Sequence, residues 1–116
     1  MSSVRVVFPP YSRAELIERL RADVPALSAA LPLERVVLFG SWAHGRATAS
    51  SDVDLLVVYR APKRDDAYEA VLHALSVRRV EPHVYTVDEA EQLEDVLGRM
   101  ARGGVELFPV AVGAPK

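Results

Sequence analysis

Cysteine is absent from this chain of 116 residues. Its absence excludes disulfide-stapled scaffolds and zinc sites built on thiolates. Long apolar runs are missing too, so neither a membrane span nor a signal peptide is expected. The formal net charge is only −2, and no overall basic field therefore attracts nucleic acid. We accordingly predict a cytoplasmic location, no membrane contact and no direct binding of nucleic acid.

The composition that remains is ordinary for a globular domain, with 50% apolar and 26% charged residues and no internal repeat. A chain of this length buries roughly two thirds of its unfolded surface, which is enough for one core without covalent staples. We therefore expect residues 1–116 to fold as a single domain.

Short apolar runs alternate with amphipathic segments along the chain. The runs rich in β-branched and aromatic residues predict strands at residues 35–39, 52–59, 81–86 and 105–108. Apolar residues at helical spacing predict helices from residue 13 to a break at Pro25, at 65–76 and at 87–102. Residues 4–8 fit an edge strand or a loose arm, and residues 113–116 a frayed tail. The predicted fold class is α/β (α+β), with a small mixed sheet and flanking helices.

The first candidate site follows the strand that ends at Phe39. Gly40 and Ser41 come directly after it, and a short helix is expected to begin there. Free amides at a helix N-terminus favour an anion such as phosphate, glycine permits its close approach, and serine adds a hydroxyl donor. The alternative interpretation of the pair is an ordinary turn with an N-cap.

The second candidate site opens the next strand. Asp52 and Asp54 are two residues apart, so both carboxylates point to one face of that strand. Their mutual repulsion would be relieved by a divalent cation, and carboxylate oxygens are ligands that suit magnesium. The alternative is a solvated strand end with two surface acids. Ten residues separate Ser41 from Asp52, which is enough to bring phosphate donors and metal ligands to one cleft.

Together these motifs resemble the signature of the polymerase-β-like nucleotidyltransferases, and within them the minimal nucleotidyltransferase branch. The resemblance is strong over residues 36–58, where Gly45-Arg46 and the segment from Ser51 to Val57 also follow the pattern of that branch. It implies the polymerase-β-like fold and a transfer of a nucleoside monophosphate from ATP to a hydroxyl acceptor.

The resemblance also implies roles for individual residues. Asp52 and Asp54 would hold two Mg²⁺ ions, and Gly40, Ser41 and Arg46 would bind the nucleotide. The family's third carboxylate corresponds to Glu81, although glutamate replaces the commoner aspartate and Pro82-His83 interrupt the apolar run. His83 is expected either in the same cleft as Glu81 or paired with a neighbour in the strand.

Small members of this branch often pair with an all-helical HEPN protein as antitoxin and toxin. The resemblance therefore implies a HEPN-type partner, whose tyrosine would receive AMP from this chain. One alternative is a non-catalytic, nucleotide-binding antitoxin that neutralises its partner by complex formation; another is a nucleotide sensor that has lost catalysis. A ribose or antibiotic hydroxyl is a less favoured acceptor.

Other side chains near the motifs allow two interpretations each. Trp42 is expected to anchor the short helix to the core rather than cover the nucleotide. His44 and Arg46 fit either a phosphate contact or a plain surface position. Arg78 and Arg79 are expected to be solvated ends of a helix and a strand.

Overall fold

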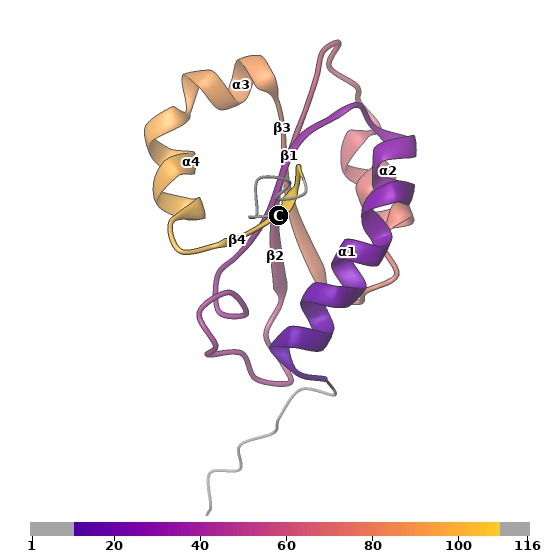
Figure 1. Cartoon of the computed structure of the whole chain (residues 1–116). Helices are drawn as coiled ribbons and strands as arrows, with labels where there is room; N and C mark the ends of the chain where they lie inside the picture. Colours follow the sequence, from indigo (N-terminus) through magenta and orange to yellow (C-terminus); the bar gives the residue numbers. More distant parts are fainter. Residues whose placement is uncertain (1–10, 110–116) are drawn as a thin grey trace, which may run out of the picture.

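The computed structural model describes residues 11–109, in which four strands form one mixed sheet with helices on both faces (Figure 1). The strands are β1 (Leu33–Phe39), β2 (Val53–Tyr59), β3 (Val80–Thr86) and β4 (Val105–Phe108), in the order β3-β2-β1-β4. Strand β1 is antiparallel to β2 and β4, whereas β2 and β3 are parallel. The predicted mixed sheet is confirmed; the segments expected at residues 4–8 and 113–116 lie outside the described residues.

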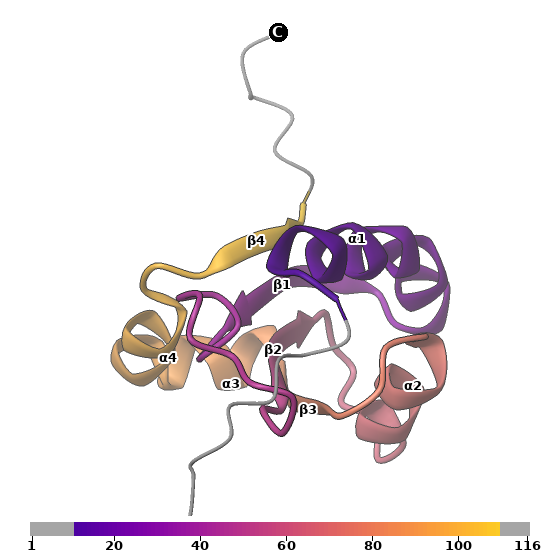
Figure 2. The ribbon, with the colours of Figure 1, turned by 90° about the horizontal axis from the view of Figure 1, so that it is seen from below.

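The helices form a layer on each side of this sheet. Helices α1 (Arg13–Ala30) and α2 (Ala67–Ala74) cover one face, and α3 (Val87–Gln92) and α4 (Glu94–Ala101) cover the other (Figures 1 and 2). None of the helices in residues 11–109 is both long and apolar enough to cross a membrane.

Helix α1 begins at the expected capping box but does not break where the sequence predicts. The Ser12 hydroxyl accepts a hydrogen bond from the Glu15 amide at 3.1 Å, and the Glu15 carboxylate accepts one from the Ser12 amide at 2.7 Å. The helix then continues through Pro25 to Ala30, so the predicted break is wrong. Leu20 and Leu27 are buried on either side of the proline. Burying each contributes about 1.5–3 kcal/mol, which together outweighs the roughly 3 kcal/mol that a proline costs inside a helix.

The expected C-terminal helix is interrupted as well. Residues 87–102 were expected to form one helix, but Leu93 has a non-helical φ of −105° and ψ of 23°, and it separates α3 from α4. Neither glycine nor proline stands at the break. It redirects the chain so that Leu97 of α4 reaches the sheet, where it is 4% exposed, while Leu93 stays 37% exposed.

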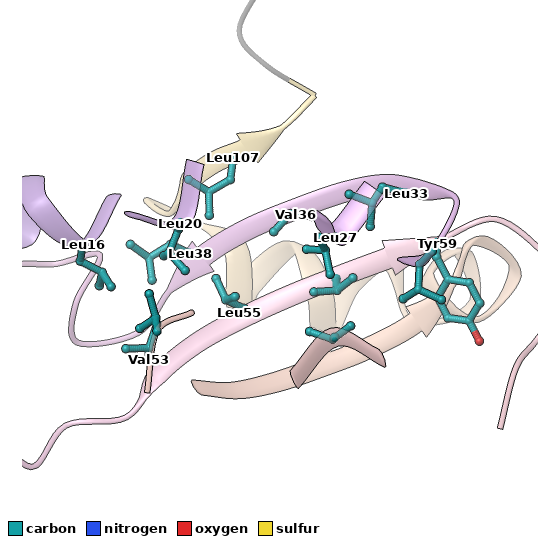
Figure 3. Packing of buried hydrophobic residues seen from close by; sticks show 14 of the residues in the cluster. Leu16, Leu20, Leu27, Leu33, Val36, Leu38, Val53, Leu55, Tyr59 and Leu107 are labelled. Atoms are coloured by element: carbon teal, nitrogen blue, oxygen red, sulfur yellow. The ribbon is translucent and has the colours of Figure 1, made fainter. Parts of the chain in front are cut away.

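Two apolar cores lie on opposite faces of the sheet. The larger one packs leucines of α1 against β1 and β2, with Leu55 pointing into it (Figure 3). Val57 belongs to the same core. The smaller one joins Val37, Leu56 and Leu97 beneath α4. Because both faces are covered, β2 is apolar at consecutive positions rather than alternating.

We expect Leu55→Ala to lower the free energy of unfolding by about 2–5 kcal/mol, because the removed side chain is 0% exposed and leaves a cavity. Leu93→Ala is the matched control, since that leucine is 37% exposed; a change within about 0.5 kcal/mol is expected. Urea unfolding followed by circular dichroism measures both. Equal losses in the two variants would contradict the described core.

Candidate active site

Asp54 occupies the centre of the candidate site, near the start of β2. Its neighbours in register are Phe39 on β1 and Glu81 on β3. Directly paired residues present their side chains on the same face of a sheet, and adjacent strands lie about 4.8 Å apart. The sheet therefore brings Asp54 and Glu81, which are far apart in sequence, to the same end of one face. Asp52 precedes Asp54 by two residues and is exposed.

Gly40 is fitted closely to the carboxylate of Asp54. Its φ is +80°, a left-handed conformation that side chains rarely adopt. A Cβ atom at this position would lie 2.3 Å from Oδ2 of Asp54. The missing side chain thus lets the carboxylate stand against the backbone of the Gly40-Ser41 segment, and the two predicted motifs meet in space.

The chain after Gly40 forms turns, not the expected short helix. Residues 41–45 are hydrogen-bonded turn, in which the His44 amide donates to the Gly40 carbonyl at 3.2 Å and the Arg46 amide to the Ser41 carbonyl at 2.8 Å. Gly45, with a φ of +74°, ends the segment. A helix N-terminus therefore supplies no phosphate site here, and any phosphate contact falls to the Ser41 hydroxyl and to amides of the turn.

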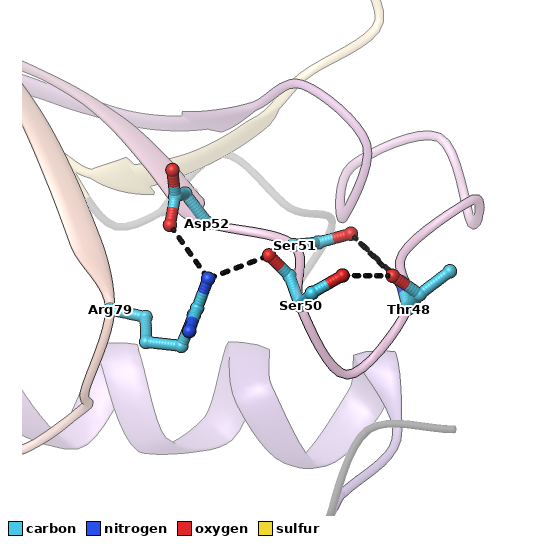
Figure 4. A network of polar contacts seen from close by, with 5 residues as sticks. All are labelled: Thr48, Ser50, Ser51, Asp52 and Arg79. Atoms are coloured by element: carbon cyan, nitrogen blue, oxygen red, sulfur yellow. Dashed lines mark hydrogen bonds and ion pairs between the residues drawn. The ribbon is translucent and has the colours of Figure 1, made fainter. Parts of the chain in front are cut away.

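Asp52 contacts Arg79, a residue that the sequence predicts to be solvated and without a role in the site. One guanidinium nitrogen of Arg79 lies 3.4 Å from Oδ1 of Asp52 and donates to the Ser50 carbonyl at 2.7 Å (Figure 4). Ser51 accepts from the Thr48 amide at 2.8 Å, which closes the same loop. Arg79 has a φ of 62°, a conformation that costs about 1–3 kcal/mol in a residue other than glycine. No local pattern in the sequence signals this contact.

The electrostatic environment of Asp54 disfavours its charged form. Burial raises the pKa of Asp54, and the nearby carboxylates of Asp52 and Glu81 raise it further, whereas His83 opposes them. Nε2 of His83 lies 3.8 Å from Oδ1 of Asp54, and the imidazole meets the Phe39 ring edge-on at 5.1 Å. His83 therefore shares the face of Asp54 and also contacts a neighbour, which combines the two expectations for it.

The donor set suits a hard divalent cation, although the side chains do not enclose one as they stand. Among residues 11–109, no three histidine, aspartate or glutamate side chains are arranged to hold a metal ion. Asp52 faces Arg79, and Glu81 is exposed, so both can turn without disturbing a core. Carboxylate oxygens are ligands that Mg²⁺ prefers, and a cation would remove the repulsion that raises the pKa of Asp54.

The remaining predicted residues lie around the same turn. Trp42 is buried, 4% exposed, and belongs to the larger core, as expected. Arg46 and His44 are exposed at the end of the turn. The His44 ring packs against Gly103 in the α4–β4 connection. A Cβ atom added to Gly103 would lie 2.9 Å from Cε1 of His44.

The sheet, the Gly40-Ser41 turn and the strand-borne carboxylates together have the layout of a nucleotide-transfer domain. Residues 14–102 match the family described as nucleotidyltransferase domain. The match runs from α1 to the end of α4, so the chain belongs to this family and is a nucleotidyltransferase by class. The resemblance inferred from residues 36–58 is thereby confirmed. No curated protein matched the sequence.

Solved structures share the fold. A candidate nucleotidyltransferase from Sulfolobus solfataricus gives a TM-score of 0.57 at 21% identity, over 81% of this chain and 80% of that one. A toxin–antitoxin structure with AMP-PNP gives 0.56 at 20% identity, over 78% and 74% of the two chains. A doubly substituted toxin–antitoxin MntA–HpeT gives 0.52 at 19% identity, over 87% and 76%. At these identities the likeness establishes the fold alone.

Proposed function

We propose that this chain transfers AMP from ATP to a hydroxyl of a partner protein, with Asp52, Asp54 and Glu81 as the catalytic carboxylates. The observation that carries the proposal is the contact between two motifs: Oδ2 of Asp54 lies 2.3 Å from the position that a Cβ atom of Gly40 would take. A carboxylate against a glycine-serine turn supports a site in which metal ligands and phosphate donors would act together. The family match supports the reaction class.

The protein's own groups have separate tasks in this reaction. The Ser41 hydroxyl and the turn amides would orient the terminal phosphates, with Arg46 beside them, and positioning supplies much of the rate gain. Two Mg²⁺ ions bound by Asp52, Asp54 and Glu81 would lower the pKa of the acceptor hydroxyl and neutralise the leaving group.

The transfer itself is an in-line displacement. The acceptor oxygen forms a bond to the α-phosphorus of ATP while the bond from that phosphorus to the α,β-bridging oxygen breaks, and pyrophosphate leaves. The hydroxyl proton passes to a carboxylate, a role for which we propose Glu81 because it is exposed and in register with Asp54.

We further propose that the acceptor is a tyrosine of a helical, HEPN-type toxin and that this chain is its antitoxin. Two solved structures with the same fold are described as toxin–antitoxin, and one of them contains AMP-PNP. A tyrosine side chain offers the hydroxyl that the displacement requires.

Intact-mass measurement tests the transfer. The chain is incubated with ATP, Mg²⁺ and a helical, HEPN-type protein from the same organism, and we expect that partner to gain the mass of one AMP. Replacing the modified tyrosine of the partner by phenylalanine should abolish the gain. A stable complex whose partner keeps its mass would refute transfer and would identify an antitoxin that acts by contact alone.

A further inference from the structure

A cavity lies on the side of β2 that faces α1, opposite to Asp54. It has a volume of about 550 Å³ and is lined in part by Ser51 and Val53. Successive side chains of a strand alternate between faces, so Val53 points away from the carboxylate of Asp54, and Ser51 lies in the loop that precedes the strand. The cavity therefore opens toward α1, on the face whose core contains Val53.

Positive charge dominates the lining of this cavity. Arg19 of α1, Arg78 and Arg79 all line it, and none of the described lining residues is acidic. Arg79 is partly compensated by Asp52 at 3.4 Å. Arg19 and Arg78 form no ion pair with another residue of the described segment. Three guanidiniums around one cavity repel one another, and an anion between them would remove that repulsion.

Two aromatic side chains form another part of the wall. The rings of Tyr11 and Trp42 are stacked with centroids 5.4 Å apart, and the Arg19 guanidinium lies 4.7 Å from the Tyr11 centroid. The indole Nε1–H of Trp42 is buried without a hydrogen-bond partner among the described residues. Buried donors are rarely left unpaired, but this nitrogen is fully buried and does not face the cavity. The wall therefore offers a ligand the arginine side chains and the aromatic rings.

We propose that the cavity between Arg19, Trp42 and Arg78 binds a phosphate-bearing small molecule of nucleotide size, at a site separate from the Asp54 carboxylate. Guanidinium groups match phosphate oxygens with paired, charge-assisted hydrogen bonds. The volume lies within the range of small-molecule sites. The inference does not depend on the proposed transfer reaction, because none of Asp52, Asp54 and Glu81 lines the cavity, which meets that site only through the contact of Arg79 with Asp52.

The test uses AMP as the probe, in the presence of EDTA so that no divalent cation can support binding at the carboxylates. Trp42 is the single tryptophan of the chain, so its fluorescence reports on this cavity, and isothermal titration measures the affinity. We expect saturable binding of AMP that inorganic phosphate displaces and that weakens as salt is raised. Adenosine, which lacks the phosphate, should not bind.

Variants locate the site. Arg78→Gln should weaken AMP binding about tenfold, the effect of losing one charge-assisted contact, and Arg19→Gln should do the same. Arg21→Gln on the same helix is the matched control, because Arg21 is exposed and does not line the cavity; it should bind AMP as the unchanged chain does. Asp54→Asn should also leave AMP binding unchanged.

Three results would overturn the proposal. One is the absence of AMP binding to the folded chain, with folding verified by circular dichroism. Another is adenosine binding as tightly as AMP. The third is binding that Asp54→Asn abolishes and Arg78→Gln leaves intact, because the nucleotide would then occupy the transfer site.

Discussion

Asp54→Asn is expected to reduce AMP transfer by on the order of a thousandfold or more, while the fold is retained. The substitution keeps the size of the side chain but removes the charge that would hold the cation. It acts at the one carboxylate that is in register with Glu81 and stands against Gly40. Pyrophosphate release and the mass of the acceptor measure the loss.

Asp65→Asn is the control for this result, because Asp65 is an exposed acid in the connection between β2 and α2. Its transfer rate should equal that of the unchanged chain. Transfer by Asp54→Asn at more than a tenth of the original rate would remove Asp54 from the catalytic site.

The Asp54→Asn variant should also be more stable than the parent at neutral pH. Folding raises the pKa of Asp54, chiefly through burial, so the folded state holds that proton more tightly than the unfolded chain. The stabilising contribution is complete below the unfolded pKa and is lost as pH rises through the folded pKa. Asparagine carries no charge and escapes this loss.

We therefore expect the melting temperature of Asp54→Asn to exceed that of the parent at pH 7. The difference should shrink as pH falls through the raised folded pKa of Asp54 and be gone below the ordinary pKa of aspartate. Mg²⁺ with a non-hydrolysable ATP analogue should stabilise the parent more than the variant, because only the parent keeps the full carboxylate site. If the parent were more stable than Asp54→Asn at pH 7 without ligand, the charge of the Asp54 carboxylate would be compensated in the folded state, and the prediction would be wrong.

Gly40→Ala is expected to impair both the fold and the reaction. Alanine in the left-handed conformation of Gly40 costs about 1–2 kcal/mol. Its Cβ would also lie 2.3 Å from Oδ2 of Asp54 and must displace that carboxylate. Since a misplacement near 1 Å can cost about a hundredfold in rate, transfer should fall by on the order of a hundredfold. Thermal unfolding and acceptor mass measure the two effects.

Substitutions at two other glycines separate the effect of backbone strain from the effect of the clash with Asp54. Gly45→Ala meets the same strain, with φ of +74°, but nothing lies within 4 Å of its added Cβ; we expect lost stability with nearly normal transfer. Gly98→Ala lies in α4 with open space around it, and the better helix former should stabilise the chain by about 0.5–1 kcal/mol. If Gly40→Ala behaves like Gly45→Ala, the contact with Asp54 has no part in the reaction.

Much of the fold follows from local patterns. The four strands were predictable because β-branched and aromatic runs were bounded by glycine and by polar segments. The start of α1 was predictable because Ser12 and Glu15 form a capping box from residues three apart. The continuation of α1 through Pro25 and the break at Leu93 were not predictable, since burial against the sheet decides both.

The candidate site was likewise predictable from the sequence only in part. The pairing of Gly40-Ser41 with Asp52 and Asp54 could be predicted, because the two motifs lie close in sequence and alternation fixes the face of the two acids. The turn in place of a helix after Gly40 could not, and neither could the bond from Arg79 to Asp52. Such contacts depend on where the fold places a segment that is distant in sequence.

By itself, the sequence determined the strand that carries Asp52 and Asp54, the glycine before Ser41 and the class of chemistry these residues suit, because spacing and backbone freedom are local properties. Only the tertiary structure decided that Glu81 lies in register with Asp54 and that Arg19, Arg78 and Arg79 surround one cavity. The register of β3 on β2 and the packing of α1 on the sheet are set by burial of apolar surface over the whole domain, which no short segment encodes.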